Sequence, residues 1–66
     1  MTEKEKINFY IMNKPLIIES LKSTPETKML WRKLFWTTAK DSNEYKRGCV
    51  EIFKSNFNNK FDNLVN

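Results

Sequence analysis

Cys49 is the only cysteine of the chain, and the sequence contains no histidine. These two facts exclude an internal disulfide and the usual ligand set of a structural zinc site, so we expect no metal and no other cofactor. Domains of this size hide only about 60% of the surface that their unfolded chain exposes, and they need crosslinks, very good packing or a partner subunit. Nine aromatic residues favour packing, although a homodimer would use the same residues. We expect residues 1–66 to form a single small helical domain.

Proline and capping residues indicate where two helices of this domain begin. Asn13 lies near the N-cap and Pro15 in the first turn of a helix that should end near Ser23. Thr24 is then expected to cap a second helix, with Pro25 at its first position, where the missing N–H costs nothing. Together with the C-terminal residues, these helices predict an all-α fold, a small bundle of three to four helices.

The C-terminal residues predict one long helix over residues 43–65, capped by Asp41 or Ser42. Its apolar residues recur every three or four positions and form a stripe: Tyr45, Cys49, Ile52, Phe53, Phe57, Phe61 and Leu64. Gly48 within this helix either allows the close approach of another backbone or is simply tolerated. We expect the last residues to complete the core; the alternative is a frayed end whose exposed phenylalanines form a contact surface or a dimer seam.

The N-terminal residues fit two elements, of which we favour a helix. Thr2 and Glu5 form a capping-box pattern, which is typical of a helix start. Polar and apolar residues also alternate here as in a strand: Lys6, Ile7, Asn8, Phe9, Tyr10 and Ile11. With a strand, the order strand, helix, helix resembles the ribbon-helix-helix repressors, in which two chains pair their strands in the DNA major groove. That resemblance implies a dimer in which Lys6, Asn8 and Tyr10 face the bases.

Residues 28–36, with the sequence KMLWRKLFW, combine two tryptophans with three cations. At about 100° per residue, one side of this helix is apolar and predicted to be buried; it holds Thr27, Leu30, Trp31, Leu34, Phe35 and Thr38. The opposite side carries Lys28, Arg32, Lys33 and Lys40, with Met29 and Trp36 between them. Trp31 is therefore predicted to belong to the core, whereas Trp36 belongs to a face that packing does not explain.

The candidate binding site is this basic and aromatic face, formed by Lys28, Arg32, Lys33, Trp36 and Lys40. Such a face fits a protein-binding hot spot, and it equally fits phosphate contact with base stacking. A formal charge of +4 and a pI of about 9.4 suit an anionic partner. The simplest alternative is a solvated surface, with Trp36 covered by the N-terminal segment.

We therefore expect a regulator or inhibitor that binds a protein target, such as nucleic-acid-handling machinery, through the basic and aromatic face. The alternative is a protein that binds DNA or RNA directly. Short chains rich in lysine and asparagine are typical of accessory proteins of phages, plasmids or AT-rich bacteria, which fits either function.

Catalysis is not expected, so we predict that the protein is not an enzyme and has no small-molecule substrate. Its eight acidic residues are scattered, and Cys49 belongs to an apolar stripe, which suits a buried side chain better than a nucleophile. A single glycine cannot form a phosphate-binding loop. No apolar run reaches the length of a membrane span or a secretory signal, and the unpaired cysteine suits a reducing compartment. These features predict a cytoplasmic protein without membrane contact.

Overall fold

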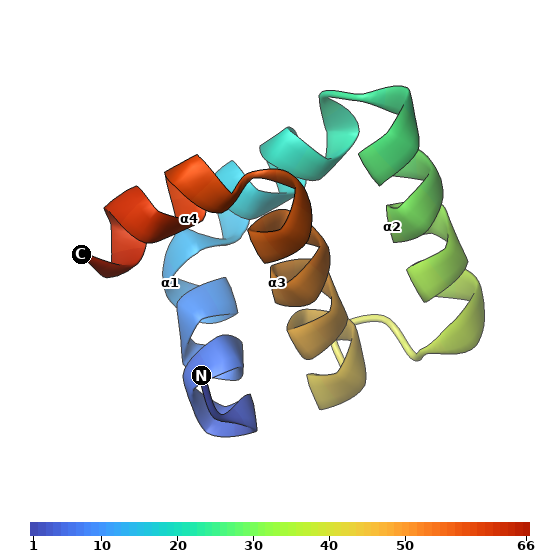
Figure 1. The fold of residues 1–66 in the computed structure, drawn as a ribbon. Coiled ribbons are helices and arrows are strands. Elements are labelled where there is room, and N and C mark those ends of the chain that lie inside the picture. Colours follow the sequence, from blue (N-terminus) through green and yellow to red (C-terminus); the bar gives the residue numbers. More distant parts are fainter.

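The computed structural model describes all 66 residues and contains four helices and no strand (Figure 1). In chain order these are α1 (Glu3–Lys22), α2 (Pro25–Thr37), α3 (Asn43–Asn56) and α4 (Asn58–Val65). Figure 1 shows α2 at the outer edge of the bundle and α4 turning away from the end of α3. The prediction of an all-α bundle of three to four helices is confirmed. The alternative with an N-terminal strand, and the strand-paired dimer that it implied, is wrong.

Helix α1 begins at the predicted capping box. The Thr2 N–H donates a hydrogen bond to Glu5 Oε1 at 2.8 Å, and Thr2 Oγ1 accepts one from the Glu5 N–H at 3.2 Å. The first of these bonds is the main reason why the pKa of the Glu5 carboxyl group is lowered, since it stabilises the ionised form. Phe9 and Tyr10 are both buried, whereas Ile11 is 58% exposed. Adjacent residues of a strand point to opposite faces, so a strand with one buried face could not bury both Phe9 and Tyr10, as the helix does.

Helix α1 bends at Asn13, whose φ of −124° and ψ of 19° are not helical. Pro15 follows two residues later and lacks a backbone N–H, and the Asn13 Nδ2 donates to the Phe9 carbonyl at 3.0 Å. The predicted helix after Asn13 is thus the second half of α1 and not a separate element. Asn13 lies at the predicted boundary, where the backbone is not helical, but its side chain bonds to the first half and does not cap the second. The predicted end is confirmed, because Ser23 is the C-cap of α1.

A buried threonine fixes the start of α2 against the end of α1. As predicted, Thr24 caps α2, with its Oγ1 accepting from the Thr27 N–H at 3.1 Å, and Pro25 is the first helical residue. The Thr27 hydroxyl in turn donates to the Leu21 carbonyl of α1 at 2.8 Å. This bond satisfies one of the carbonyls that the end of α1 leaves without a helical partner.

The C-terminal part of the chain forms two helices where one was predicted. Ser42 caps α3 by accepting from the Tyr45 N–H at 3.1 Å, and Asp41, the other candidate cap, has a positive φ of 63° in the preceding turn. The helix breaks at Phe57, whose φ is −133° and ψ is 48°. A straight helix would carry Phe61 past the end of the core, whereas the bend places its ring centroid 5.0 Å from that of Phe9. Burial of Phe61 therefore explains why the prediction of one long helix was wrong.

The core lies between α1 and α3, and α4 closes one end of it. Nine hydrophobic residues are buried there: Phe9, Tyr10, Ile17 and Leu21 from α1, Tyr45, Cys49, Val50 and Phe53 from α3, and Phe61 from α4. The expected C-terminal completion of the core is thus confirmed for Phe61, while Phe57 is half-buried and Leu64 is exposed. Helix α2 contributes no hydrophobic residue to the fully buried set, so it is held to the bundle by only one side.

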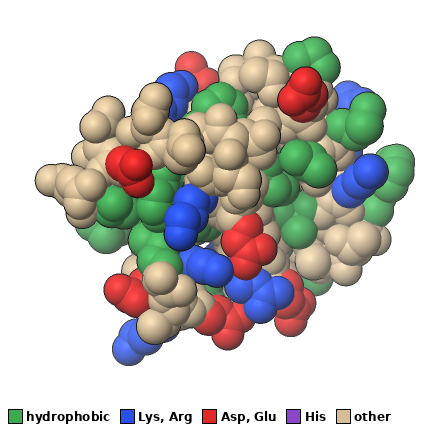
Figure 2. All heavy atoms as spheres, in the orientation of Figure 1, with side chains coloured by type: hydrophobic (Ala, Val, Ile, Leu, Met, Phe, Trp, Pro, Cys, Tyr) green, Lys and Arg blue, Asp and Glu red, His purple; other side chains and the backbone are tan.

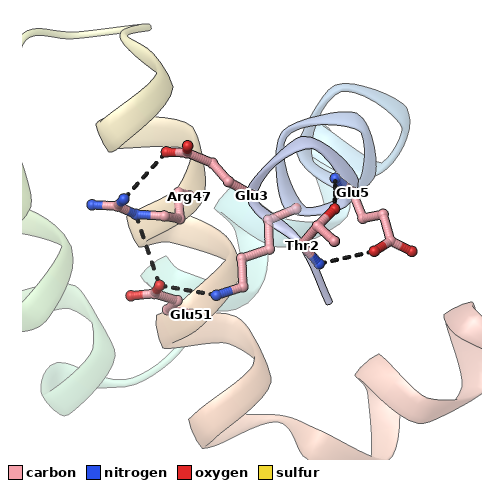
Figure 3. Close-up of polar contacts among 6 residues, drawn as sticks. Thr2, Glu3, Glu5, Arg47 and Glu51 are labelled. Atoms are coloured by element: carbon pink, nitrogen blue, oxygen red, sulfur yellow. Dashed lines mark hydrogen bonds and ion pairs between the residues drawn. The ribbon is translucent and has the colours of Figure 1, made fainter.

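A surface network of ion pairs joins the start of α1 to the middle of α3 (Figure 3). Arg47 contacts Glu3 at 3.2 Å and Glu51, one helical turn further on, at 3.8 Å, while Lys6 contacts Glu51 at 3.1 Å. Exposed pairs of this kind each contribute less than about 1 kcal/mol. Lys6 and Arg47 are nevertheless the only two of the twelve cations that form ion pairs, so the positive charge elsewhere is not neutralised locally.

Gly48 allows α2 to approach α3 closely. A Cβ atom at this position would lie 2.6 Å from Leu34 Cδ1 and 2.8 Å from Leu34 Cδ2. Of the two roles considered for this glycine, the close approach of another helix is the one that the structure supports, although the partner atoms belong to a side chain rather than to a backbone. Leu34 is half-buried in this contact and holds the inner side of α2 to the core.

The substitution Gly48→Ala is expected to have different effects in two backgrounds. In the native chain the new methyl group meets the two Cδ atoms of Leu34, which have to shift, and this offsets the gain of about 1 kcal/mol in helix propensity, so the free energy of unfolding does not rise. In a Leu34→Ala chain the space is open, and Gly48→Ala should raise the free energy of unfolding by about 1 kcal/mol. Urea denaturation of the four chains measures both effects. A gain in both backgrounds would contradict the close approach.

Candidate functional site

Helix α2 presents one side entirely to solvent. This surface, called here the outer face of α2, consists of Lys28, Met29, Arg32, Lys33 and Trp36, all of which are exposed. Trp36 is 83% exposed and Met29 is 62% exposed, so neither is covered by the N-terminal segment, and the alternative that Trp36 is covered in this way is wrong. Figure 2 shows hydrophobic and cationic side chains side by side at the right-hand edge of the molecule, over α2.

The spacing of these residues places an apolar pair and cations on the same strip of helix surface. Met29 and Trp36 are seven residues apart, which is two turns, and Arg32 and Lys33 lie between them at three- and four-residue spacings. Lys28 lies one turn before Arg32 along the same side. The strip has hydrophobic ends and a cationic middle, and its two hydrophobic residues are the most exposed large hydrophobic side chains of α2.

Lys40, the fifth predicted site residue, is not on this strip. Helix α2 ends at Thr37, and Thr38 has extended backbone with φ −135° and ψ 155°. The Leu34 carbonyl accepts the last helical hydrogen bond, from the Thr38 N–H at 3.0 Å, and the hydroxyl groups of Thr37 and Thr38 also donate to it, at 3.3 Å and 2.7 Å. Lys40 therefore lies in the turn after α2, where it lines a cleft on the other side of the helix.

The buried side of α2 is narrower than the sequence predicts. Thr27 is buried, and Trp31, Leu34 and Phe35 are half-buried, in agreement with the predicted arc. Leu30 is 41% exposed, so its assignment to the core was wrong. Because α2 stands at the edge of the bundle, α1 and α3 cover only its inner side, which leaves Leu30 partly open to solvent.

Trp31 belongs to the inner side of α2 and is fixed by contacts to three elements. Its indole N–H donates to the Tyr45 hydroxyl at 2.9 Å, and its ring centroid lies 4.7 Å from that of Phe35. Lys22 Nζ lies 5.4 Å from the centre of the indole, at a distance typical of a cation–π contact. The separate roles predicted for Trp31 and Trp36 agree with these positions.

Two lysines of α1 lie beside this inner side and were missed by the sequence analysis. Lys14 and Lys22 line the same cleft as Lys40, Trp31 and Phe35. A pattern that could have identified them is the four-residue spacing of Lys14, Ile18 and Lys22, which places all three on one side of α1. The turn at residues 23–24 reverses the chain, so that α2 lies beside this side of α1.

Cys49 has the environment of a structural side chain. It is fully buried, and this burial raises the pKa of its thiol to about 11. Burial likewise raises the pKa of Tyr10 and Tyr45, so the core hydroxyl groups stay protonated. No group of three acidic, cysteine or histidine side chains lies close enough to hold a metal ion. None of the helices combines the length and apolar composition required to cross a membrane.

Comparison with protein-family models, with characterised proteins and with solved structures gives no match. The function is therefore argued from the chain's own residues.

The two tryptophans are expected to differ sharply in their effect on stability. Trp31→Ala removes a packed ring and a hydrogen bond to Tyr45, and should lower the free energy of unfolding by about 2 to 4 kcal/mol. Trp36→Ala removes an exposed side chain, and should change it by less than about 0.5 kcal/mol. Urea denaturation followed by circular dichroism measures both values. Equal losses would show that the outer face is part of the core.

Cys49 is expected to react with a thiol reagent only when the chain opens. Labelling by a disulfide reagent at about pH 8 should be limited by unfolding in the native protein and become immediate in guanidinium chloride. Because the pKa is raised in the folded state, the thiol's contribution to stability is complete below its unfolded pKa and is lost as the pH rises toward about 11. Immediate labelling of the folded protein would contradict the buried position.

Proposed function

We propose that this protein acts by binding a partner protein through the outer face of α2, as a regulator or inhibitor and not as a catalyst. The observation that carries the proposal is the 83% exposure of Trp36 on a helix whose inner side already holds it to the bundle. Large aromatic side chains, methionine and arginine are the residue types that protein interfaces enrich, and lysine is depleted from them. Trp36, Met29 and Arg32 match that composition, while the lysines lie beside them.

The spacing of the outer face fits a helix that docks into a groove. Helical ligands of this kind present anchors at positions i, i+3 or i+4, and i+7, which here are Met29, Arg32 or Lys33, and Trp36. A buried aromatic side chain removes about 150–250 Å² from water. At about 25 cal/mol per Å², Trp36 alone offers roughly 4 to 6 kcal/mol of gross stabilisation, enough for the central residue of an interface.

The charges of the outer face indicate an acidic partner. Lys28, Arg32 and Lys33 form no ion pair within the chain, so a partner with carboxylate groups around an apolar groove would complement them. A net charge of +4 gives long-range attraction to the same kind of surface. Proteins that imitate nucleic acid present such acidic surfaces, and we place the partner among them, or among acidic surfaces of the machinery that handles nucleic acids, in the cytoplasm.

The experiment compares two exposed side chains of nearly equal accessibility. Trp36→Ala changes the outer face, and Met12→Ala, at a residue that is 82% exposed on α1, serves as the matched control. Partners are captured from an extract of the source cells that has been treated with nuclease, then purified for affinity measurements. We expect a protein partner that survives nuclease, loses at least 2 kcal/mol of binding free energy on Trp36→Ala, and is unaffected by Met12→Ala.

Three results would contradict the proposal. Loss of every partner after nuclease treatment would favour direct binding of DNA or RNA by this face, with affinity that falls steeply with salt. Equal effects of Trp36→Ala and Met12→Ala would place the interface elsewhere. Self-association that Trp36→Ala abolishes would make a second copy of the chain, and not another protein, the occupant of the outer face.

A further inference from the structure

A cleft of about 260 Å³ separates the second half of α1 from the inner side of α2. Its lining combines the aromatic side chains Trp31, Phe35 and Tyr45 with the lysines Lys14, Lys22 and Lys40. The aromatic wall is held in place, because Trp31 donates to the Tyr45 hydroxyl and the ring centroids of Phe35 and Tyr45 lie 5.2 Å apart. None of the three lysines forms an ion pair within the chain.

Lys22 connects this cleft to a second hollow. A groove of about 520 Å³ at the start of α2 is lined by Lys22 together with Lys28 and Arg32. The amino group of Lys22 also lies over the Trp31 ring. Lys22 therefore contacts the aromatic wall of the cleft and lies where the cleft meets the groove. Asp41 is the only acidic residue in either lining. A basic path thus runs along the cleft and the groove, through Lys40, Lys14, Lys22, Lys28 and Arg32.

From this arrangement we infer that the protein binds a short segment of single-stranded nucleic acid along the basic path. One base inserts into the cleft against Trp31, and the flanking phosphates lie on the five cations. Sites for single strands combine these two elements, a positively charged groove that follows the backbone and aromatic side chains on which bases stack. The basic path shares Lys28 and Arg32 with the outer face of α2. The inference nevertheless does not rest on the proposed function, because Trp31, Lys14, Lys22 and Lys40 lie outside that face.

The dimensions of the two hollows favour a strand over other anions. The cleft, at about 260 Å³, lies near the lower end of the roughly 300–1,000 Å³ of small-molecule pockets, which suits a single planar group such as a base. The groove beyond Lys22 adds cations for phosphates on the next nucleotides. Duplex bases are stacked on one another and cannot enter a cleft of this kind without leaving the stack, so single strands are preferred.

The test uses Trp31 as the reporter. In a Trp36→Phe chain, Trp31 is the only indole, and its fluorescence is followed while a deoxythymidine oligomer of about eight nucleotides is added. We expect saturable quenching, with a slope of log affinity against log salt of about −3.5 for five phosphate contacts.

Lys14→Gln with Lys40→Gln should weaken binding by at least about tenfold and reduce the slope to about −2. The variant Lys4→Gln with Lys60→Gln loses the same charge outside both linings, and should change affinity by less than about twofold.

Each of the following results would overturn the inference. Unchanged Trp31 fluorescence, or equal losses in the two lysine pairs, would show that the basic path is not the binding site. Equal binding of a matched duplex would exclude base insertion. Quenching by polyglutamate at the same concentration would show that the path accepts any polyanion, including an acidic protein segment. If thymidine monophosphate binds as tightly as the oligomer, the site is a mononucleotide pocket and not a strand path.

Discussion

The packing of α1 against α3 is the interaction on which the rest of the structure depends. No disulfide or metal is available to this chain, so stability has to come from buried aromatic and aliphatic side chains. Tyr10 and Tyr45 meet across this interface with ring centroids 6.1 Å apart, and Phe9 and Phe53 with centroids 6.2 Å apart. Cys49, which is fully buried beside them, fills the remaining space as a small hydrophobic side chain. The side chains that follow the bend at Asn13 and the break at Phe57 pack into this core: Ile17 and Leu21 after the bend, and Phe61 after the break.

Helix α2 is attached to this core by one side only, and that arrangement leaves its other side free. Leu34 fits the space left by Gly48, the Thr27 hydroxyl binds the end of α1, and Trp31 binds Tyr45. These contacts hold the helix without drawing its outer face into the core. The energetic consequence is that residues such as Trp36 carry almost none of the folding stability. Packing does not offset the unfavourable exposure of these hydrophobic side chains to water, which is the physical reason for proposing that they bind a partner.

The sequence predicted those features that depend on local chemistry. Thr2, Thr24 and Ser42 are caps because a hydroxyl near a helix start satisfies free N–H groups, and this can be recognised within four residues. The break at Phe57 could not be predicted in this way, because its benefit is a contact of Phe61 with Phe9, about fifty residues away. The exposure of Trp36 followed from helical periodicity, whereas the position of Lys40 depended on where α2 ends. The positions of Lys14 and Lys22 in the cleft could not be predicted from the sequence, because they depend on the packing of α1 beside α2.

The two proposed surfaces meet at the same pair of cations, and this has a consequence for regulation. Lys28 and Arg32 belong to the outer face of α2 and also line the groove at its start. A partner protein whose carboxylates engage Arg32 would remove a phosphate contact from the basic path, while a bound strand would neutralise charges that attract the partner. Coupling between two ligands is reciprocal, so each would weaken the other by the same factor. Lys14 and Lys40 line only the cleft, so the partner protein would not compete for them. A strand would then keep its base in the cleft while the partner displaces its phosphates from the groove. The two ligands would thus compete without a change of fold, because Lys28 and Arg32 are the only cations that both surfaces use.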